Sequence, residues 1–207
     1  MLRLTNNPDR NTSFILACSG GVDSMAAASF FKRGNKNFRL AYFHHGTAQA
    51  DHMMNFVKNW GSQFGLEVLV GNITSSKPKD QSPEEHWRNE RYAWLNSFDM
   101  PICTAHHLND VAETWIFSSL HGESKLIASK NGKVFRPFLL NSKNEMTDWC
   151  IRNNVKWFED QSNTDSKYPR NRIRNQIMPE CLKINPGLLK VLKKKLIARD
   201  VATCPKN

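Results

Sequence analysis

Long apolar runs are missing from this 207-residue chain. No stretch approaches the roughly 20 consecutive apolar residues that a membrane-spanning helix needs. The first ten residues also lack the apolar segment of a secretory signal. We therefore expect a cytoplasmic protein with no membrane partner. Because 40% of the residues are hydrophobic, the chain can form the core of one sizeable globular domain.

Paired cysteines are missing as well. The five cysteines are odd in number and widely scattered, and no Cys-x-x-Cys pair occurs. This pattern argues against a disulfide framework. It also argues against a zinc knuckle or an iron–sulfur site. Cys18 and Cys103 lie in apolar runs, so we expect them to be core residues and not reactive thiols.

Acidic residues are scarce near the C-terminus. Residues 167–207 hold eleven Lys or Arg and two acidic residues, and so carry +9 of the net charge of +10. A basic end indicates a polyanion partner such as RNA or DNA, although a solubilising basic helix would give the same composition. The candidate RNA-binding residues are Arg172, Arg174, Lys193, Lys194 and Lys195.

Strand-like and helical stretches alternate along the chain. The expected strands are residues 14–18, 39–44, 66–73 and 100–106, and the expected helices are 23–33, 50–64, 83–97, 109–120, 144–154, 171–182 and 186–200. Residues 124–133 are expected to form a loop. This alternation predicts an α/β fold with a doubly wound, mostly parallel sheet. We expect a catalytic domain over residues 1–182 and a short, basic, helical extension over 183–207.

The usual mononucleotide loop, Gly-x-x-x-x-Gly-Lys-Ser/Thr, is also missing. In its place the sequence SGGVDS, residues 19–24, stands between a strand-like run and a helical run. Its glycines allow a tight turn, and its serines and the helix start can hold a phosphate. Asp23 fits such an anion site if a cation such as Mg²⁺ binds there too. For the glycine pair alone, an ordinary turn with a serine cap is the alternative.

Two carboxylates follow the fourth expected strand, in the sequence TAHHLNDVAET at residues 104–114. Asp110 and Glu113 are three residues apart, so they share one face of a helix. They could cap that helix. Alternatively, they present two carboxylates to Mg²⁺ or to the cation of an amine substrate, at the sheet edge where ligands bind.

Arginines recur in pairs at helical spacing. Arg88 and Arg91 share one face of an expected helix, and Arg170 and Arg174 are four residues apart. Guanidinium groups can hold phosphate oxygens bidentately. Surface pairing with nearby glutamates is the alternative for the first pair, and a solvated basic face is the alternative for the second.

The order of these motifs resembles the tRNA(Ile)-lysidine synthetase family of N-type PP-loop ATPases over roughly residues 12–190. In chain order the motifs are SGGVDS, FHHG at 43–46, E-x-x-x-R-x-x-R-Y at 84–92, TAHHLNDVAET, RPFL at 136–139, WFEDQSN at 157–163 and RNRIR at 170–174. The resemblance implies an adenine nucleotide alpha hydrolase-like, Rossmann-like fold. Many members carry further C-terminal domains, so we expect a short form without them.

The resemblance also implies a reaction. Free L-lysine is joined to C2 of the wobble cytidine in a tRNA(Ile) with a CAU anticodon, through an adenylated cytidine, giving lysidine, AMP and pyrophosphate. ATP and Mg²⁺ are the implied cofactors. The implied catalytic residues are Asp23, Arg88, His106, Asp110, Glu113 and Arg170. The implied ATP-binding residues are Ser19, Gly20, Gly21, Val22, Asp23, Ser24 and His44, with Mg²⁺ at Asp23. The implied lysine-binding residues are Asp110, Glu113 and Arg170.

Two other functions fit part of the pattern. Another PP-loop tRNA-modifying enzyme, such as a thiolase, would normally need a reactive cysteine pair, and none is present. A tRNA-binding relative with reduced catalysis is the second alternative. The presence of the charged residues Asp23, Arg88, Asp110, Glu113 and Arg170 argues against it.

Overall fold

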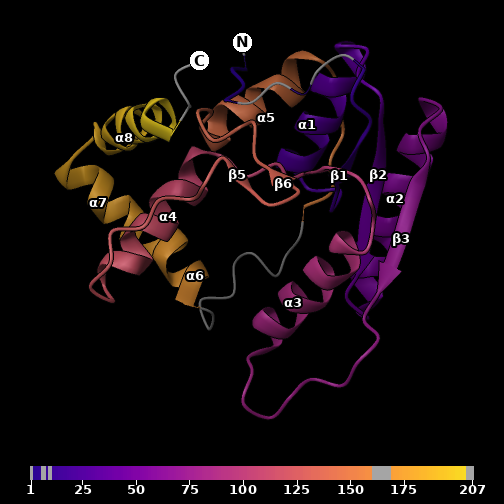
Figure 1. The fold of residues 1–207 in the computed structure, drawn as a ribbon, viewed down its shortest axis with the longest axis horizontal. Helices are drawn as coiled ribbons and strands as arrows, with labels where there is room; N and C mark the ends of the chain where they lie inside the picture. Colours follow the sequence, from indigo (N-terminus) through magenta and orange to yellow (C-terminus); the bar gives the residue numbers. More distant parts are fainter. Residues whose placement is uncertain (1, 6–7, 9–10, 160–168, 204–207) are drawn as a thin grey trace.

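The computed structural model describes residues 2–5, 8, 11–159 and 169–203. Its centre is a six-stranded sheet with the strand order β3-β2-β1-β4-β6-β5 (Figure 1). Five strands run parallel, and β5 alone pairs antiparallel to its neighbour β6. The expected α/β fold with a mostly parallel sheet is therefore confirmed.

The strands are β1 (Phe14–Ala17), β2 (Phe38–His44), β3 (Val68–Asn72), β4 (Ile102–Cys103), β5 (Lys130–Asn131) and β6 (Val134–Phe135). The helices of the sheet region are α1 (Val22–Arg33), α2 (Ala48–Gln63), α3 (Pro83–Asn96), α4 (Leu108–Ser119) and α5 (Lys143–Arg152). The chain then continues with α6 (Pro169–Arg172), the π-helix η2 (Ile173–Ile177), α7 (Met178–Ile184) and α8 (Leu188–Thr203). Most expected elements match these bounds to within a few residues.

Helices cover both faces of the sheet because side chains alternate along each strand. Phe14 and Leu16 of β1 point into an apolar cluster with residues of α1, α2 and α5. Ile15, between them, packs on the opposite face with Leu95 of α3. All three β1 side chains are fully buried. This two-sided burial explains why the strand reads as one continuous apolar run.

The hairpin of β5 and β6 is the main departure from the expected elements. Residues 124–133 were expected to form a loop, but Lys130 and Asn131 pair with Phe135 and Val134. In addition, β6 pairs parallel with β4 and so extends the sheet. Strands of two residues carry no periodic pattern, so the sequence gives no signal for them.

The C-terminal helices pack against α4, on the opposite side of the molecule from α2 and β3 (Figure 1). Leu192 and Leu196 of α8 are fully buried in one cluster with Val111 of α4. The division into 1–182 and 183–207 stays a prediction, but α8 shares this core with residues of the first part. In the described ranges, none of the helices is both long enough and apolar enough to cross a membrane.

Candidate functional site

A cavity of about 430 Å³ opens where β1, β2 and β4 end at their carboxyl edge. This is the position at which open α/β sheets bind ligands. Of the candidate residues, those that line it are Ser19, Asp23, Ser24, Arg88, His106, Asp110, Arg170 and Arg174. The fold thus brings together, around one cavity, residues that are up to 155 positions apart in the sequence.

The glycine turn borders this site through the side chains of Ser19, Asp23 and Ser24. Gly20 has φ of +84°, and a Cβ atom there would lie 3.2 Å from Cγ2 of Val57. The backbone angle therefore favours glycine, and a side chain would also press against Val57. Gly21 is the N-cap residue of α1, and no side chain caps that helix start. The first N–H groups of α1 are thus left available to an anion.

The two serines of the turn do not cap the helix. The Ser24 hydroxyl donates to the carbonyl oxygen of Gly21 at 2.9 Å, and its oxygen lies 3.4 Å from that of Ser19. The backbone N–H of Gly21 donates to Ser19 Oγ at 3.4 Å. The turn with a serine cap is therefore not the arrangement found. The hydroxyls instead line the cavity beside the open helix start.

Asp23 projects from the first turn of α1. Its Oδ1 is buried and accepts no hydrogen bond from any residue that the structure describes. No group of three His, Cys, Asp or Glu side chains with metal-site geometry occurs among the described residues. The unpartnered carboxylate oxygen of Asp23 has the chemistry that Mg²⁺ binds, so this residue could hold such an ion.

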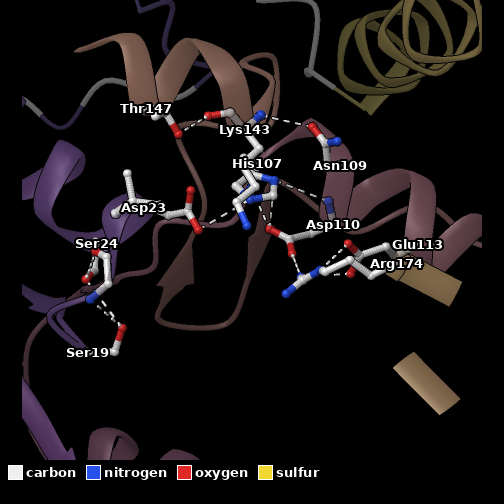
Figure 2. A network of polar contacts seen from close by, with 12 residues as sticks. Ser19, Asp23, Ser24, His107, Asn109, Asp110, Glu113, Lys143, Thr147 and Arg174 are labelled. Atoms are coloured by element: carbon white, nitrogen blue, oxygen red, sulfur yellow. Dashed lines mark hydrogen bonds and ion pairs between the residues drawn. The ribbon is translucent and has the colours of Figure 1, made fainter. Parts of the chain in front are cut away.

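His107 connects Asp23 to α4 (Figure 2). Its Nε2 lies 3.5 Å from Oδ2 of Asp23. Its Nδ1 accepts the backbone N–H of Asp110 at 3.3 Å, and Asp110 Oδ2 accepts the backbone N–H of His107 at 2.8 Å. This reciprocal pair is a capping box. The sequence offered capping and substrate binding as alternatives for Asp110, and the structure has one carboxylate oxygen in the cap and the other facing Arg174.

Arg174 joins the two carboxylates of α4. Its Nε donates to Glu113 Oε1 at 2.7 Å, while Nη2 donates to Glu113 Oε2 at 3.0 Å and to Asp110 Oδ1 at 3.3 Å (Figure 2). The Glu113 side chain is only 2% exposed. Burial would lower the pKa of Arg174, but the hydrogen bond and charge of Glu113 raise it above its usual value. Arg174 is thus bound within the acidic pair, and RNA binding by this residue stays a prediction.

The pKa of Asp110 lies below its usual value. Burial alone would raise this pKa. Four effects outweigh burial: the charge of His107, the charge of His106, the backbone N–H of His107 and the charge of Arg174. Asp110 is therefore an anion near neutral pH. The acidic pair thus offers a strong binding position for a cation.

Arg170 and Arg88 flank the acidic pair. Arg170 Nη2 donates to Thr114 Oγ1 at 3.3 Å, and its Nε lies 4.0 Å from Glu113 Oε2. The Arg88 guanidinium lies 4.9 Å from the centre of the Tyr92 ring. Among the described residues Arg88 makes no ion pair with a glutamate, so the surface pairing considered for it is not found. Both arginines also line a second cavity of about 380 Å³ that includes Glu113.

His106 is held beside the cavity by Thr104, whose Oγ1 lies 2.8 Å from its Nδ1. Burial lowers the pKa of His106 to about 4. The negative charge of Asp110 opposes this shift, whereas the positive charges of Arg136 and Arg170 add to it. The imidazole is therefore neutral near pH 7. It can donate or accept a hydrogen bond without adding charge.

His44 does not line the cavity. Its Nε2 lies 3.1 Å from Asp51 Oδ1, and its Nδ1 accepts the backbone N–H of Gly46 at 3.1 Å. The next residue, His45, lines the cavity instead and packs against Trp87 with ring centres 5.5 Å apart. The motif FHHG contains both histidines, and only the strand end decides which one faces inward.

His45 and Trp87 also line the cavity and were not among the candidates. Arg91 lines it too, and its helical face shared with Arg88 was the signal for it. Trp87 had none, because an aromatic residue in an amphipathic helix reads as core.

The basic candidates of α8 lie outside both cavities. Lys194 and Lys195 are exposed, as is Arg172 on α6, and Lys193 is half-buried. The acidic and polar run at 160–165, including the end of the WFEDQSN motif, falls outside the described residues. RNA binding by the lysines stays a prediction.

Comparison with known proteins agrees with this geometry. The PP-loop domain family matches residues 1–181. A tRNA(Ile)-lysidine synthase of Haemophilus ducreyi is 29% identical over 98% of this chain and 48% of its own length. The corresponding protein of Thermosipho africanus is 30% identical over 86% of this chain and 46% of its own. The chain thus spans about half the length of these curated relatives.

A solved structure supports the fold. An NH3-dependent NAD synthetase from Campylobacter jejuni superposes with a TM-score of 0.53 over 97% of this chain and 90% of its own, at 15% identity. That likeness concerns the fold alone. The family match over most of the chain confirms the resemblance in the motifs, and the chain therefore belongs to the PP-loop family.

Proposed function

We propose that this protein joins free lysine to C2 of the wobble cytidine in a tRNA(Ile) with a CAU anticodon, using ATP. The observation that carries the proposal is that one cavity, of about 430 Å³, borders the glycine turn, Arg88, His106 and Asp110 together. The similarity to proteins named tRNA(Ile)-lysidine synthase supports the same reaction.

The first step activates the cytosine. Its O2 attacks the α-phosphate of ATP, an O–P bond forms, and the bond to pyrophosphate breaks. The N–H groups at the start of α1 and the hydroxyls of Ser19 and Ser24 would hold the departing pyrophosphate. Arg88 would stabilise the charge that develops on the α-phosphate. When bound at Asp23, Mg²⁺ would supply charge that neutralises the phosphates.

The second step uses lysine. Its ε-nitrogen attacks C2, the C2–O bond breaks, and AMP leaves with that oxygen. Asp110 and Glu113 would bind the ammonium before the reaction, and a carboxylate of the pair can take the proton that the amine loses. Arg170, beside Glu113, would face the adenylate. Holding three reactants in line accounts for a large part of such catalysis.

The alternative of sulfur transfer fits the described cysteines poorly. Cys18 borders the cavity, but burial raises its pKa, although Gly20 and Ser24 lower it. Burial also raises the pKa of Cys103 well above its usual value. Thiols with raised pKa values are poor nucleophiles near neutral pH, so neither residue suits a thiolase.

The test is incorporation of radiolabelled lysine into tRNA in the presence of ATP and Mg²⁺. We expect label in a tRNA(Ile) transcript with a CAU anticodon and none in the same transcript with a GAU anticodon. Asp23→Asn should abolish label, whereas Arg39→Ala, which removes a surface ion pair with Glu67, should keep it. Absence of label with the unaltered protein, under conditions in which a full-length relative works, would overturn the proposal.

A further inference from the structure

Arg174 occupies the two carboxylates that the proposed function assigns to the lysine ammonium. We infer that Arg174 is an internal competitor for the amine substrate: lysine binds by displacing its guanidinium from Glu113 and Asp110. This inference rests on the proposed function. It adds a residue that sets the strength and selectivity of amine binding.

The geometry shows how fully the acceptors are used. Three hydrogen bonds of 2.7 to 3.3 Å join Arg174 to both oxygens of Glu113 and to Oδ1 of Asp110. The remaining oxygen of Asp110 accepts the backbone N–H of His107. A primary ammonium has three donors and needs acceptors on the same oxygens. Because Arg174 already lies within 3.3 Å of three of the four carboxylate oxygens, a lysine ammonium that takes a central position on the pair has to displace the guanidinium.

Burial makes the binding an exchange of cations. The Glu113 side chain is 2% exposed and that of Asp110 15% exposed. An uncompensated buried carboxylate is destabilising, so most molecules hold a cation on the pair both before and after lysine binds. Arg170 and His107 compensate the pair less closely than Arg174 does. Arg170 Nε lies 4.0 Å from Glu113 Oε2 while its Nη2 donates to Thr114, and the His107 ring contacts only Asp110 Oδ2.

Arg174 has room to leave. Its side chain is 28% exposed and borders the large cavity. It also stands in η2, a π-helical segment between α6 and α7. Such segments interrupt regular helices and are frequent at functional sites. A guanidinium that leaves the pair can therefore be solvated within the cavity.

The competition has a quantitative consequence. An amine binds only the fraction of molecules whose carboxylates are free, so its apparent affinity is reduced by that fraction. Removing Arg174 should therefore strengthen amine binding. It should also loosen selectivity, because the vacated position has the shape of a guanidinium ion.

The first test observes Arg174 directly in the unaltered protein. Protein labelled with ¹⁵N-arginine gives Nε–H resonances, and loss of one resonance in Arg174→Lys assigns it. Lysine should shift or broaden the Arg174 resonance, whereas norleucine, which has the same chain without the ammonium, should not. An unchanged resonance at saturating lysine would overturn the inference.

The second test is kinetic. In Arg174→Lys, which keeps a cation but loses the bidentate fork, the KM for lysine should fall by about tenfold if about a tenth of molecules have a free pair. Arg174→Ala should behave alike and become sensitive to inhibition by free guanidinium ion. Arg39→Ala is the matched control. It removes an exposed arginine–glutamate pair, Arg39 with Glu67, that does not line the cavity, so the KM for lysine should stay unchanged. A raised KM in both Arg174 variants would show that Arg174 assists lysine binding, and would overturn the inference.

The two proposals fail in different ways. If lysine shifts the Arg174 resonance but tRNA takes up no label, the proposed reaction is wrong and the exchange stands. If tRNA is labelled while the Arg174 resonance stays unchanged, the reaction stands and the exchange is wrong.

Discussion

The imidazole Nε2 of His107 lies 3.5 Å from Oδ2 of Asp23. The same ring caps α4 through the backbone N–H of Asp110. One buried side chain therefore joins the glycine turn, where the pyrophosphate is proposed to bind, to the helix that carries the acidic pair (Figure 2). It fixes the position of Asp23 relative to Asp110 in a way that neither element could by itself.

His107→Asn separates these two roles of His107. Asparagine is a good N-cap residue, so α4 should stay intact, but the contact to Asp23 is lost. Pyrophosphate release with ATP and tRNA, measured without lysine, should fall by about tenfold, as is usual when a group that orients a ligand-binding side chain is removed. His107→Ala should lose the same activity and about 1 kcal/mol of stability as well. Full pyrophosphate release by the asparagine variant would contradict this role.

His106 should make folding stability depend on pH. Its pKa is lowered to about 4 in the folded protein, against about 6.5 for an unperturbed histidine. Below about pH 6.5, His106 binds a proton in the unfolded chain but stays neutral in the folded protein. The free energy of unfolding is therefore highest above about pH 6.5 and falls as the pH is lowered toward 4. Between pH 7 and pH 5 the free energy of unfolding should fall in both proteins, but by about 1–2 kcal/mol less in His106→Gln than in the unaltered protein.

The chemical shifts of the His106 ring provide the independent check. They should stay flat from pH 8 to pH 5 if burial holds the pKa near 4. A titration midpoint near 6.5 would contradict the prediction.

Leu192 tests whether α8 is part of the folded core. This side chain is fully buried, whereas that of the neighbouring Val191 is 43% exposed. Leu192→Ala should lower the free energy of unfolding by about 2–5 kcal/mol, and Val191→Ala should change it by less than about 0.5 kcal/mol. Urea denaturation measures both. Equal, small effects would mean that α8 contributes little to the stability of the rest of the chain.

Lys194 and Lys195 test the predicted RNA contact. Both are exposed on α8, so their replacement by alanine should leave the fold intact. If each neutralises a tRNA phosphate, the double variant should bind tRNA more weakly and reduce the slope of log K against log salt by about 0.7–0.9 per contact.

Lys58 and Lys79 provide the charge-matched control for this pair, because both are exposed and lie on α2 and in the loop before α3. Their double alanine variant should keep the original slope. Equal losses in both double variants would indicate a general effect of charge and no contact at α8.

Much of the fold was predictable because its signals are local. The apolar run at 14–18, the glycine turn after it and the amphipathic helices are all read from neighbouring residues. The hairpin of β5 and β6 was not predictable, since its pairing depends on β4, about thirty residues away. The π-helix at Ile173–Ile177 also gave no signal within a segment that reads as one continuous helix.

The sequence alone determined the chemical types at the site: a glycine turn between a strand and a helix, an acidic pair on one helical face, and pairs of arginines at helical spacing. Local spacing sets these properties. The tertiary structure decided the partners. It turned His44 toward Asp51, placed His107 between Asp23 and Asp110, and paired Arg174 with Glu113 across 61 residues. Each of these contacts joins two different elements: β2 and α2, α1 and the start of α4, and η2 and α4. They depend on how the elements pack, and a buried charge is stable only where that packing gives it a partner.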